Sequence, residues 1–223
     1  MLQVEIWSDV VCPFCYMGKR RFENALDSFE HKKDVQVVWR SFQLDPDIRP
    51  APGLSIFDYL AERKGIPASE SRRLHAGLTA TAAKLGLSYN FDKAVVANTF
   101  DAHRVTHLAR ERGVQHAMEE RLFAAYFTEG RNIADVDTLA VVGAEAGLDP
   151  AEIRQMVSEN RYANEVRSDA REAAELGADG VPFYVFNRAY AVSGAQPSEL
   201  FLEVLQKVWE ERASVQLQGS SPS

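Results

Sequence analysis

Strand-like patterns occur near the two ends of this 223-residue chain, and the apolar residues of the long segment between them have helical spacing. Residues 2–8 alternate as a short strand, helical spacing follows Pro13, and Val35 to Arg40 form a second strand-like run. Toward the other end, residues 182–186 are apolar and aromatic, residues 190–192 can pair with them, and an amphipathic helix follows. The order β-α-β, helices, β-β-α predicts one small α/β domain that is split by a helical insertion.

A segment rich in proline and glycine marks the first boundary. Residues 44–53 contain three prolines and one glycine, which end the first β-α-β unit. We predict a discontinuous domain of residues 1–44 and 177–213, with an all-helical insertion of residues 54–176. The polar tail, residues 214–223, lacks periodicity and is predicted to be disordered. The helices expected in the insertion span residues 56–64, 69–85, 98–112, 114–127, 136–146 and a stretch that begins at Pro150.

Composition excludes several classes of protein. Hydrophobic residues make up 46% of the chain and charged residues 26%, as in ordinary globular proteins and unlike disordered chains. The formal net charge of -7 disfavours a nucleic-acid partner, because such binding needs a clustered basic surface. The sequence has no apolar run long enough for a bilayer and no pattern of a secretory signal. We therefore expect no membrane association and a cytoplasmic location.

The two cysteines lie in the motif Cys12-Pro13-Phe14-Cys15, where the first strand gives way to a helix. Unpaired N–H groups and the helix dipole favour a thiolate at that point, so Cys12 is the expected nucleophile, exposed and with a depressed pKa. Pro13 fits the first helical turn, and Cys15, one turn later and buried, can resolve a mixed disulfide. Phe14 brings neither a donor nor a charge to the thiolate, which predicts a moderate redox potential.

Two other interpretations of the pair stay open on the motif alone. Buried free cysteines need no chemistry, and structural zinc usually takes four ligands, of which the pair supplies half. His103 and His107 are spaced i, i+4, but Arg104 stands where a zinc-protease helix carries its glutamate. No metal is therefore expected. The remaining histidines, which stand among charged residues and are expected to have no catalytic role, are His31, His75 and His116.

Several spaced motifs give the chain a family resemblance over about residues 3–210. It resembles the DsbA-type thioredoxin-like oxidoreductases, and within them the cytosolic FrnE-like branch. The resemblance implies a thioredoxin fold with a helical insertion and the activity of a thiol-disulfide oxidoreductase or disulfide isomerase. Its substrates would be thiols or disulfides, with no permanently bound cofactor, and glutathione can serve as a redox partner. The matching segments are residues 4–21, Asn98 to Arg104, Tyr126 to Arg131, Gly180 to Phe183 and Val192 to Pro197.

The resemblance also implies that Pro182 is cis and lies beside the cysteine pair. A proline has no N–H, so the backbone of Val181 would be free to pair with an extended thiol substrate next to Pro13 and Phe14. From the pattern alone, a trans proline that begins an edge strand is the alternative.

Further groove residues are suggested by the same resemblance. Asn98, His103 and Arg104 would face Cys12 from the helical insertion, although a solvated helix face or a structural histidine explains them as well. Asp9 either assists proton transfer or ends the strand. The related kappa glutathione transferases and 2-hydroxychromene-2-carboxylate isomerases hold glutathione near the turn that corresponds to Ala195 and Gln196. The alternative function is therefore a glutathione-dependent isomerase or transferase acting on a small organic substrate. Those relatives commonly carry a serine at the first cysteine position, and this chain keeps both cysteines, which favours dithiol chemistry.

Overall fold

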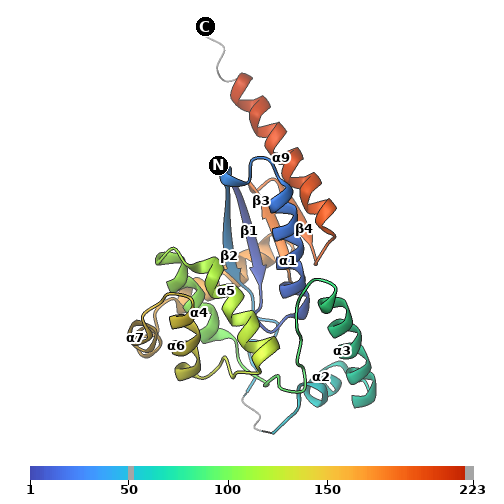
Figure 1. Cartoon of the computed structure of the whole chain (residues 1–223). Coiled ribbons are helices and arrows are strands. Elements are labelled where there is room, and N and C mark those ends of the chain that lie inside the picture. The colour runs from blue at the N-terminus through green and yellow to red at the C-terminus, as the bar shows by residue number, and fades with distance from the viewer. Residues whose placement is uncertain (50–52, 219–223) are drawn as a thin grey trace.

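A mixed sheet of four strands in the order β2-β1-β3-β4 forms the centre of the molecule (Figure 1). The computed structural model describes residues 1–49 and 53–218, and the statements below refer to them. The central strand β1 pairs in parallel with β2 and antiparallel with β3, and β3 pairs antiparallel with β4. The strands are β1 (Leu2–Ser8), β2 (Val35–Ser41), β3 (Phe183–Phe186) and β4 (Tyr190–Ser193).

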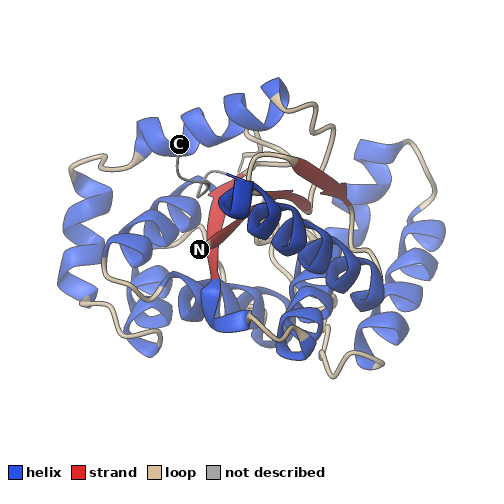
Figure 2. Ribbon diagram, turned by 90° about the horizontal axis from the view of Figure 1, so that it is seen from above, coloured by secondary structure: helices blue, strands red, loops and turns tan. Residues whose placement is uncertain are grey.

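Alternation along β1 gives the sheet two apolar faces. Val4 and Ile6 lie in one cluster with Phe22 of α1 (Pro13–Ser28) and Phe201 of α9 (Ser198–Gln218), which pack together on that face. Trp7 lies in a second cluster with residues of β3 and of α8 (Ala163–Glu175). Viewed from above, helices surround the sheet (Figure 2). The expected α/β class and thioredoxin fold with a helical insertion are confirmed.

The helices between β2 and α8 gather toward the end of the sheet to which β1 points, and two of them also contact the edge strand β2 (Figure 1). Because Cys12 follows β1, this arrangement places the cysteine pair between the sheet and the helices. Side-chain caps at Ser55, Asp135 and Asp149 begin three of the helices, and Pro150 takes the first position after Asp149, as predicted. The helices are α2 (Ile56–Lys64), α3 (Ala68–Ala83), α4 (Phe100–Glu111), α5 (Gln115–Phe123), α6 (Val136–Glu145) and α7 (Pro150–Ser158), with a short 3-10 turn at Lys32–Asp34.

The structure departs from the predicted elements in three places. The helix expected over residues 114–127 is α5 followed by a π-helical segment, Ala124–Glu129, and the stretch after Pro150 holds two helices. The chain turns between those two at Asn160 and Tyr162, both in the left-handed region.

The tail predicted to be disordered from residue 214 instead continues α9 to Gln218, since helix propagation meets no glycine or proline before Gly219. The rest of that tail, residues 219–223, and residues 50–52 of the predicted break lie outside the described residues. The predicted domain boundaries stay predictions.

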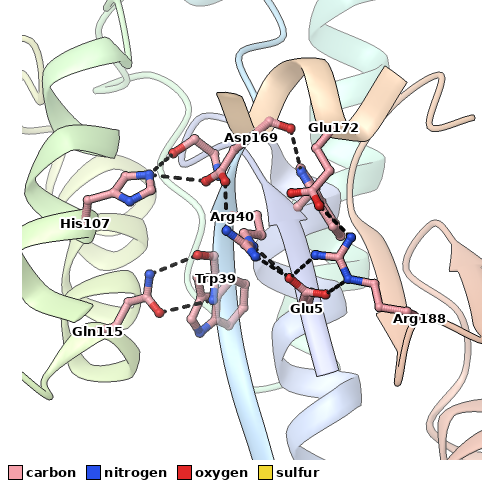
Figure 3. Close-up of polar contacts among 10 residues, drawn as sticks. Glu5, Trp39, Arg40, His107, Gln115, Asp169, Glu172 and Arg188 are labelled. Atoms are coloured by element: carbon pink, nitrogen blue, oxygen red, sulfur yellow. Dashed lines mark hydrogen bonds and ion pairs between the residues drawn. The ribbon is translucent and has the colours of Figure 1, made fainter. Parts of the chain in front are cut away.

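A buried ion-pair network joins the sheet to the helices (Figure 3). Asp169 of α8 accepts a hydrogen bond from the Ser41 amide at 2.9 Å and pairs with Arg40 at 3.1 Å and with His107 of α4 at 3.2 Å. Burial alone raises the pKa of Asp169, but His107, the amide and Arg40 outweigh it and lower the pKa. Arg40 also pairs with the buried Glu5 of β1. The edge strand β2 is therefore held by polar side chains from two helices, Asp169 of α8 and His107 of α4.

A second polar contact between the helices and the sheet resembles the hydrogen bonding of a neighbouring strand. Gln115, at the start of α5, donates from its side-chain amide to the Trp39 carbonyl at 2.9 Å and accepts from the Trp39 N–H at 3.1 Å. Figure 3 shows this contact beside the ion-pair network. Both free backbone groups of Trp39 on the sheet edge are thereby satisfied.

None of the helices formed by the described residues has the length and apolar character that crossing a membrane requires.

Candidate active site

The strand-to-helix junction positions the cysteine pair as the sequence predicts. Cys12 is the N-cap of α1, in an extended conformation with φ of -85° and ψ of 113°, and Pro13 takes the first helical position. The Cys12 amide donates to the Asp9 carbonyl at 2.9 Å, which closes the turn after β1. The Cys15 amide donates to the Cys12 carbonyl at 3.0 Å. The two cysteines are free thiols, one helical turn apart.

The burial of the pair differs from the prediction. Cys15 is 1% exposed, as expected, but Cys12 is only 3% exposed, so the expectation of an exposed Cys12 is wrong. The Cys12 thiol is covered on one side by the Val181 carbonyl, to which it donates at 3.5 Å. Sequence spacing carried no information about this contact, because Val181 is distant along the chain. Access to Cys12 is through a cavity described below.

The environment of Cys15 keeps it protonated. Burial, and then the neighbouring Cys12, raise the pKa of the Cys15 thiol well above its ordinary value. The Asp9 backbone and the Ser8 hydroxyl act in the opposite direction without cancelling the effect. A protonated Cys15 does not compete with Cys12 for an incoming substrate.

Pro182 lies at the site, with a cis Val181–Pro182 peptide bond. Gly18 of α1 lets the helix approach it, because a Cβ built on Gly18 would lie 3.0 Å from Pro182 Cγ and 2.5 Å from the Tyr184 hydroxyl. The Pro182 carbonyl accepts from the Gly194 amide at 2.8 Å. The Pro182 carbonyl is therefore already engaged, and the Val181 carbonyl is bonded only to the cysteine thiol among the hydrogen bonds described.

Gly18→Ala is expected to lower the free energy of unfolding by about 1–3 kcal/mol, because the added methyl group overlaps a buried hydroxyl and the ring of Pro182. Urea denaturation measures the change. Gly77→Ala is the matched control, since nothing lies within 4 Å of a Cβ at this helical position of α3 and alanine favours the helix. Equal effects of the two substitutions would contradict the close approach of α1.

A cavity of about 510 Å³ opens beside Cys12. Cys12, Pro13, Phe14 and Val181 line one side, and residues of α2 and α3 line the other. Phe14 is 50% exposed at this cavity. The structure thus brings these predicted site residues together, and their contact with a substrate stays a prediction.

Three predicted groove residues do not line this cavity, and their expected position is wrong. Asn98 instead donates to the carbonyls of Pro46 and Ile48, each at 3.2 Å, and so holds a loop. Arg104 is 2% exposed and binds carbonyls at the end of α7. His103 is also buried and lies behind the cavity wall. His103 and Arg104 belong to the first turns of α4 and pack inside the helical part of the molecule, whereas Asn98 precedes that helix.

Ala195 and Gln196 lie on the turn after β4 and also outside the cavity lining. The Ala195 carbonyl accepts from Arg21 of α1, and the Gln196 side chain donates to the Ser193 carbonyl at 2.9 Å. Ala195 lies near Gly18, on the Pro182 side of the helix. Their contact with a peptide-like thiol stays a prediction, at a place separate from the cavity.

The surroundings of the other histidines were only partly predicted. His31 stacks on Trp209 with ring centroids 4.3 Å apart, and His116 pairs with Glu23 at 2.8 Å. His75 does not lie among charged neighbours as expected. It is buried between Phe57 and Phe91 and lines the cavity.

A group of buried ionisable side chains lies behind the cysteine pair, and sequence patterns did not indicate it. Asp9 is 1% exposed, lines the cavity, accepts from the Leu44 amide at 2.8 Å and forms an ion pair with His103 at 3.4 Å. Burial lowers the pKa of His103, but Asp9 outweighs it and raises the pKa. Burial raises the pKa of the nearby Glu119 to about 7. Asp9 was singled out in the sequence because it precedes Cys12 by three residues, and His103 through the family resemblance, whereas nothing in the sequence pointed to Glu119.

Glu119→Gln is expected to remove part of the pH dependence of stability. Because its folded pKa is raised from 4.5 to about 7, folded Glu119 holds a proton that the unfolded chain has lost, so stability falls as pH rises through this window. Between about pH 5 and about pH 8 the wild type should lose about 2 kcal/mol more unfolding free energy than the variant. Urea denaturation at both values measures the difference, with Glu62→Gln at an exposed position as control. Parallel pH profiles for wild type and Glu119→Gln would contradict the raised pKa.

Comparison with known proteins agrees with this geometry. Residues 3–206 match the family model described as the DSBA-like thioredoxin domain. The chain is 43% identical to a probable DsbA oxidoreductase from Streptomyces coelicolor, SCO1869, whose crystal structure superposes with a TM-score of 0.89 over 95% of this chain and 91% of the other. It is 30% identical over 202 residues to the uncharacterized protein YwbO of Bacillus subtilis (strain 168), covering 90% of this chain and 94% of that protein.

A more distant structure shows the fold alone. The cytosolic disulfide reductase DsbM from Pseudomonas aeruginosa, solved with GSH, is 20% identical, with a TM-score of 0.66 over 93% of this chain and 99% of that one. The FrnE-like branch and the cytoplasmic location stay predictions. With the family model spanning nearly the whole chain and free cysteines at the start of α1 beside a cis-proline, the chain belongs to the DsbA-like thioredoxin family and is a disulfide oxidoreductase.

Proposed function

We propose that the protein exchanges thiols and disulfides through Cys12 as nucleophile and Cys15 as resolving thiol. The observation that carries the proposal is the asymmetry of the pair. Cys12 caps α1 and lines the cavity, whereas Cys15 lies inside the protein with a raised pKa. A thiolate is favoured at a helix start and disfavoured in an apolar interior.

The reaction proceeds in two exchange steps. The Cys12 thiolate attacks one sulfur of the substrate disulfide, that S–S bond breaks, and one substrate thiolate leaves with the electron pair. Cys15 then gives its proton to the substrate thiolate released in the first step and attacks the Cys12 sulfur of the mixed disulfide. The Cys12–substrate S–S bond breaks, and the second substrate thiolate leaves. The substrate gains two electrons and the protein holds a Cys12–Cys15 disulfide. The same steps in reverse oxidise a dithiol, and release at the mixed-disulfide stage allows isomerisation.

Val181 is the proposed docking point for the substrate backbone. Its carbonyl accepts the Cys12 thiol in the reduced protein. Once Cys12 has formed a mixed disulfide, that donor is lost and the carbonyl can accept an N–H from an extended substrate. Pro182 has no N–H, so no backbone donor at the adjacent position competes with the substrate for the Val181 carbonyl.

Glutathione is the proposed redox partner, and the proposed location is the cytosol. DsbM, which shares the fold, is described as a cytosolic disulfide reductase and was solved with GSH. In this chain the turn at Ala195 and Gln196 is the candidate contact for a peptide-like thiol. In the cytosol dithiols are kept reduced, and a reduced pair is the form that attacks a disulfide.

Titration of the protein against mixtures of reduced and oxidised glutathione tests the proposal. Mass spectrometry after acid quenching should show the loss of two hydrogens in a single transition, from which the redox potential follows. Oxidation that yields only a glutathione adduct, together with turnover of an aromatic small molecule, would instead favour the isomerase or transferase alternative. A pair that does not oxidise at any ratio would overturn dithiol chemistry.

A further inference from the structure

The cavity beside Cys12 has the size of a small-molecule site. Its volume of about 510 Å³ falls within the range of about 300–1,000 Å³ that is typical of ligand pockets. Apolar side chains make up most of its lining, including Ile56, Leu60, Leu78 and Val96. An extended peptide docked at Val181 needs no such enclosed apolar space. The cavity is therefore suited to the apolar body of a small substrate whose sulfur reaches Cys12.

The helices α2 and α3 form its outer wall and are fastened to the rest of the protein through polar contacts. The Tyr59 hydroxyl and the Arg63 guanidinium both bind the Asp45 carboxylate, and Arg63 donates to the Leu44 carbonyl at 2.9 Å. Asp45 and Arg63 thus neutralise one another within the lining. Neither is available to bind the charge of a ligand.

Lys64 differs from the other charged residues of the lining. Asp9 is paired with His103, and burial lowers the pKa of His75, whose ring nitrogen Nδ1 donates to the Ser71 carbonyl at 2.7 Å. Lys64 has no ion pair and no hydrogen bond within residues 1–49 and 53–212, whose side chains are described. Its charge acts on His75 of the neighbouring helix α3 and lowers the pKa of that ring further. The lining therefore carries an uncompensated positive charge next to apolar surface.

The Tyr126 side chain brings a hydroxyl group to the apolar lining of the cavity. It is 2% exposed and lines the cavity, and its hydroxyl has no hydrogen bond to any side chain or backbone group in the described part of the chain. The hydroxyl is both a donor and an acceptor, and a polar atom of a ligand in the cavity can bind it.

We propose that this cavity selects small disulfides, including mixed disulfides, that combine an apolar aromatic body with a carboxylate. The sulfur lies at Cys12, the aromatic body lies against the apolar lining, and the carboxylate pairs with Lys64. The inference rests on the proposed function of Cys12, and the chemistry is the two-step exchange described above. Protein disulfides dock at Val181, and their reduction does not depend on Lys64 or on the apolar lining of the cavity.

A matched pair of disulfides tests the inference. The disulfides of 4-mercaptobenzoate and 4-mercaptobenzamide have nearly the same shape and differ in charge. Prereduced protein is mixed with each in a single turnover, and the released aryl thiol is followed by absorbance. The measured quantity is the rate constant for the carboxylate divided by that for the amide. Comparison between variants cancels the intrinsic reactivities of the two reagents.

Lys64 is exposed, so Lys64→Gln is expected to lower this ratio by up to about fivefold, the upper end of the range for exposed ion pairs. Lys64→Arg should retain it. Lys84→Gln, at an exposed position of the same helical pair outside the lining, should also leave the ratio unchanged. An equal ratio in wild type and Lys64→Gln, with circular dichroism showing both folded, would overturn the proposed selection.

Insulin reduction by the wild type separates this inference from the proposed function. If insulin is reduced and the ratio does not depend on Lys64, the cavity inference fails and dithiol chemistry stands. If the wild type reduces neither insulin nor either aryl disulfide, the proposed function fails and the cavity inference fails with it.

Discussion

Replacing Cys12 with serine is expected to abolish the reduction of insulin disulfides. A serine hydroxyl does not ionise at neutral pH, and Cys15 cannot substitute, because it is 1% exposed and its pKa is raised by burial. Turbidity from precipitated insulin chains measures the activity, with dithiothreitol as the reductant. Retention of activity in Cys12→Ser would contradict the assignment of Cys12 as the nucleophile.

Cys15→Ala provides the complementary result. Cys12 can still attack, but nothing resolves the mixed disulfide, so covalent adducts with substrate thiols should accumulate. Non-reducing gels and mass spectrometry detect them, and their sensitivity to reductant identifies the bond. Adducts at Cys12 in this variant and none in Cys12→Ser would give both cysteines the roles assigned here. Adducts that form at Cys15 when Cys12 is absent would reverse those roles.

Asp169→Asn is expected to lower the free energy of unfolding by about 3 kcal/mol at neutral pH, as is typical when one partner of a buried ion pair is removed. One carboxylate oxygen pairs with Arg40, and the other accepts from Ser41 and pairs with His107. An amide cannot accept at both positions, so at least one buried donor is left without a partner. Urea denaturation measures the effect.

An exposed carboxylate serves as the control for Asp169→Asn, and the pH dependence of stability gives a second test. Asp137→Asn removes a carboxylate that pairs with Arg154 while 73% exposed, and should cost under about 1 kcal/mol. Because the pKa of folded Asp169 is lowered, its contribution is present above the ordinary aspartate pKa and is lost as pH falls through the folded value. The difference between wild type and Asp169→Asn should therefore shrink in acid. Equal costs for the two substitutions would contradict the network of Figure 3.

Local periodicity predicted the strands, most helices and the position of the cysteine pair, because these depend on neighbours along the chain. Alternation in residues 2–8 gave β1, and the change of period at Pro13 placed Cys12 at the start of α1. The cis Val181–Pro182 bond came from the family resemblance, since a trans proline fits the same local pattern.

The site required tertiary contacts that periodicity does not contain. The burial of Cys12 depends on Val181, which packs against it from the other end of the chain. His103 and Arg104 both have the residue types of a functional groove, yet α4 turns them into the protein interior. His75 was set aside because its sequence neighbours are charged, whereas its spatial neighbours are Phe57 and Phe91.

The attachment of α2 and α3 bears on how such a protein can change during evolution. These two helices pack on each other and stand apart from the group formed by α4, α5, α6 and α7 (Figure 1). Their ties to the body include the contacts with Asp45 and a β-bridge between Ser55 and Val95, whereas Cys12 and Pro182 are held by the sheet and α1. Substitutions in the two helices can therefore alter the wall that faces a substrate while the reacting sulfurs keep their places. New substrate preferences can arise in this part of the chain without rebuilding the redox centre.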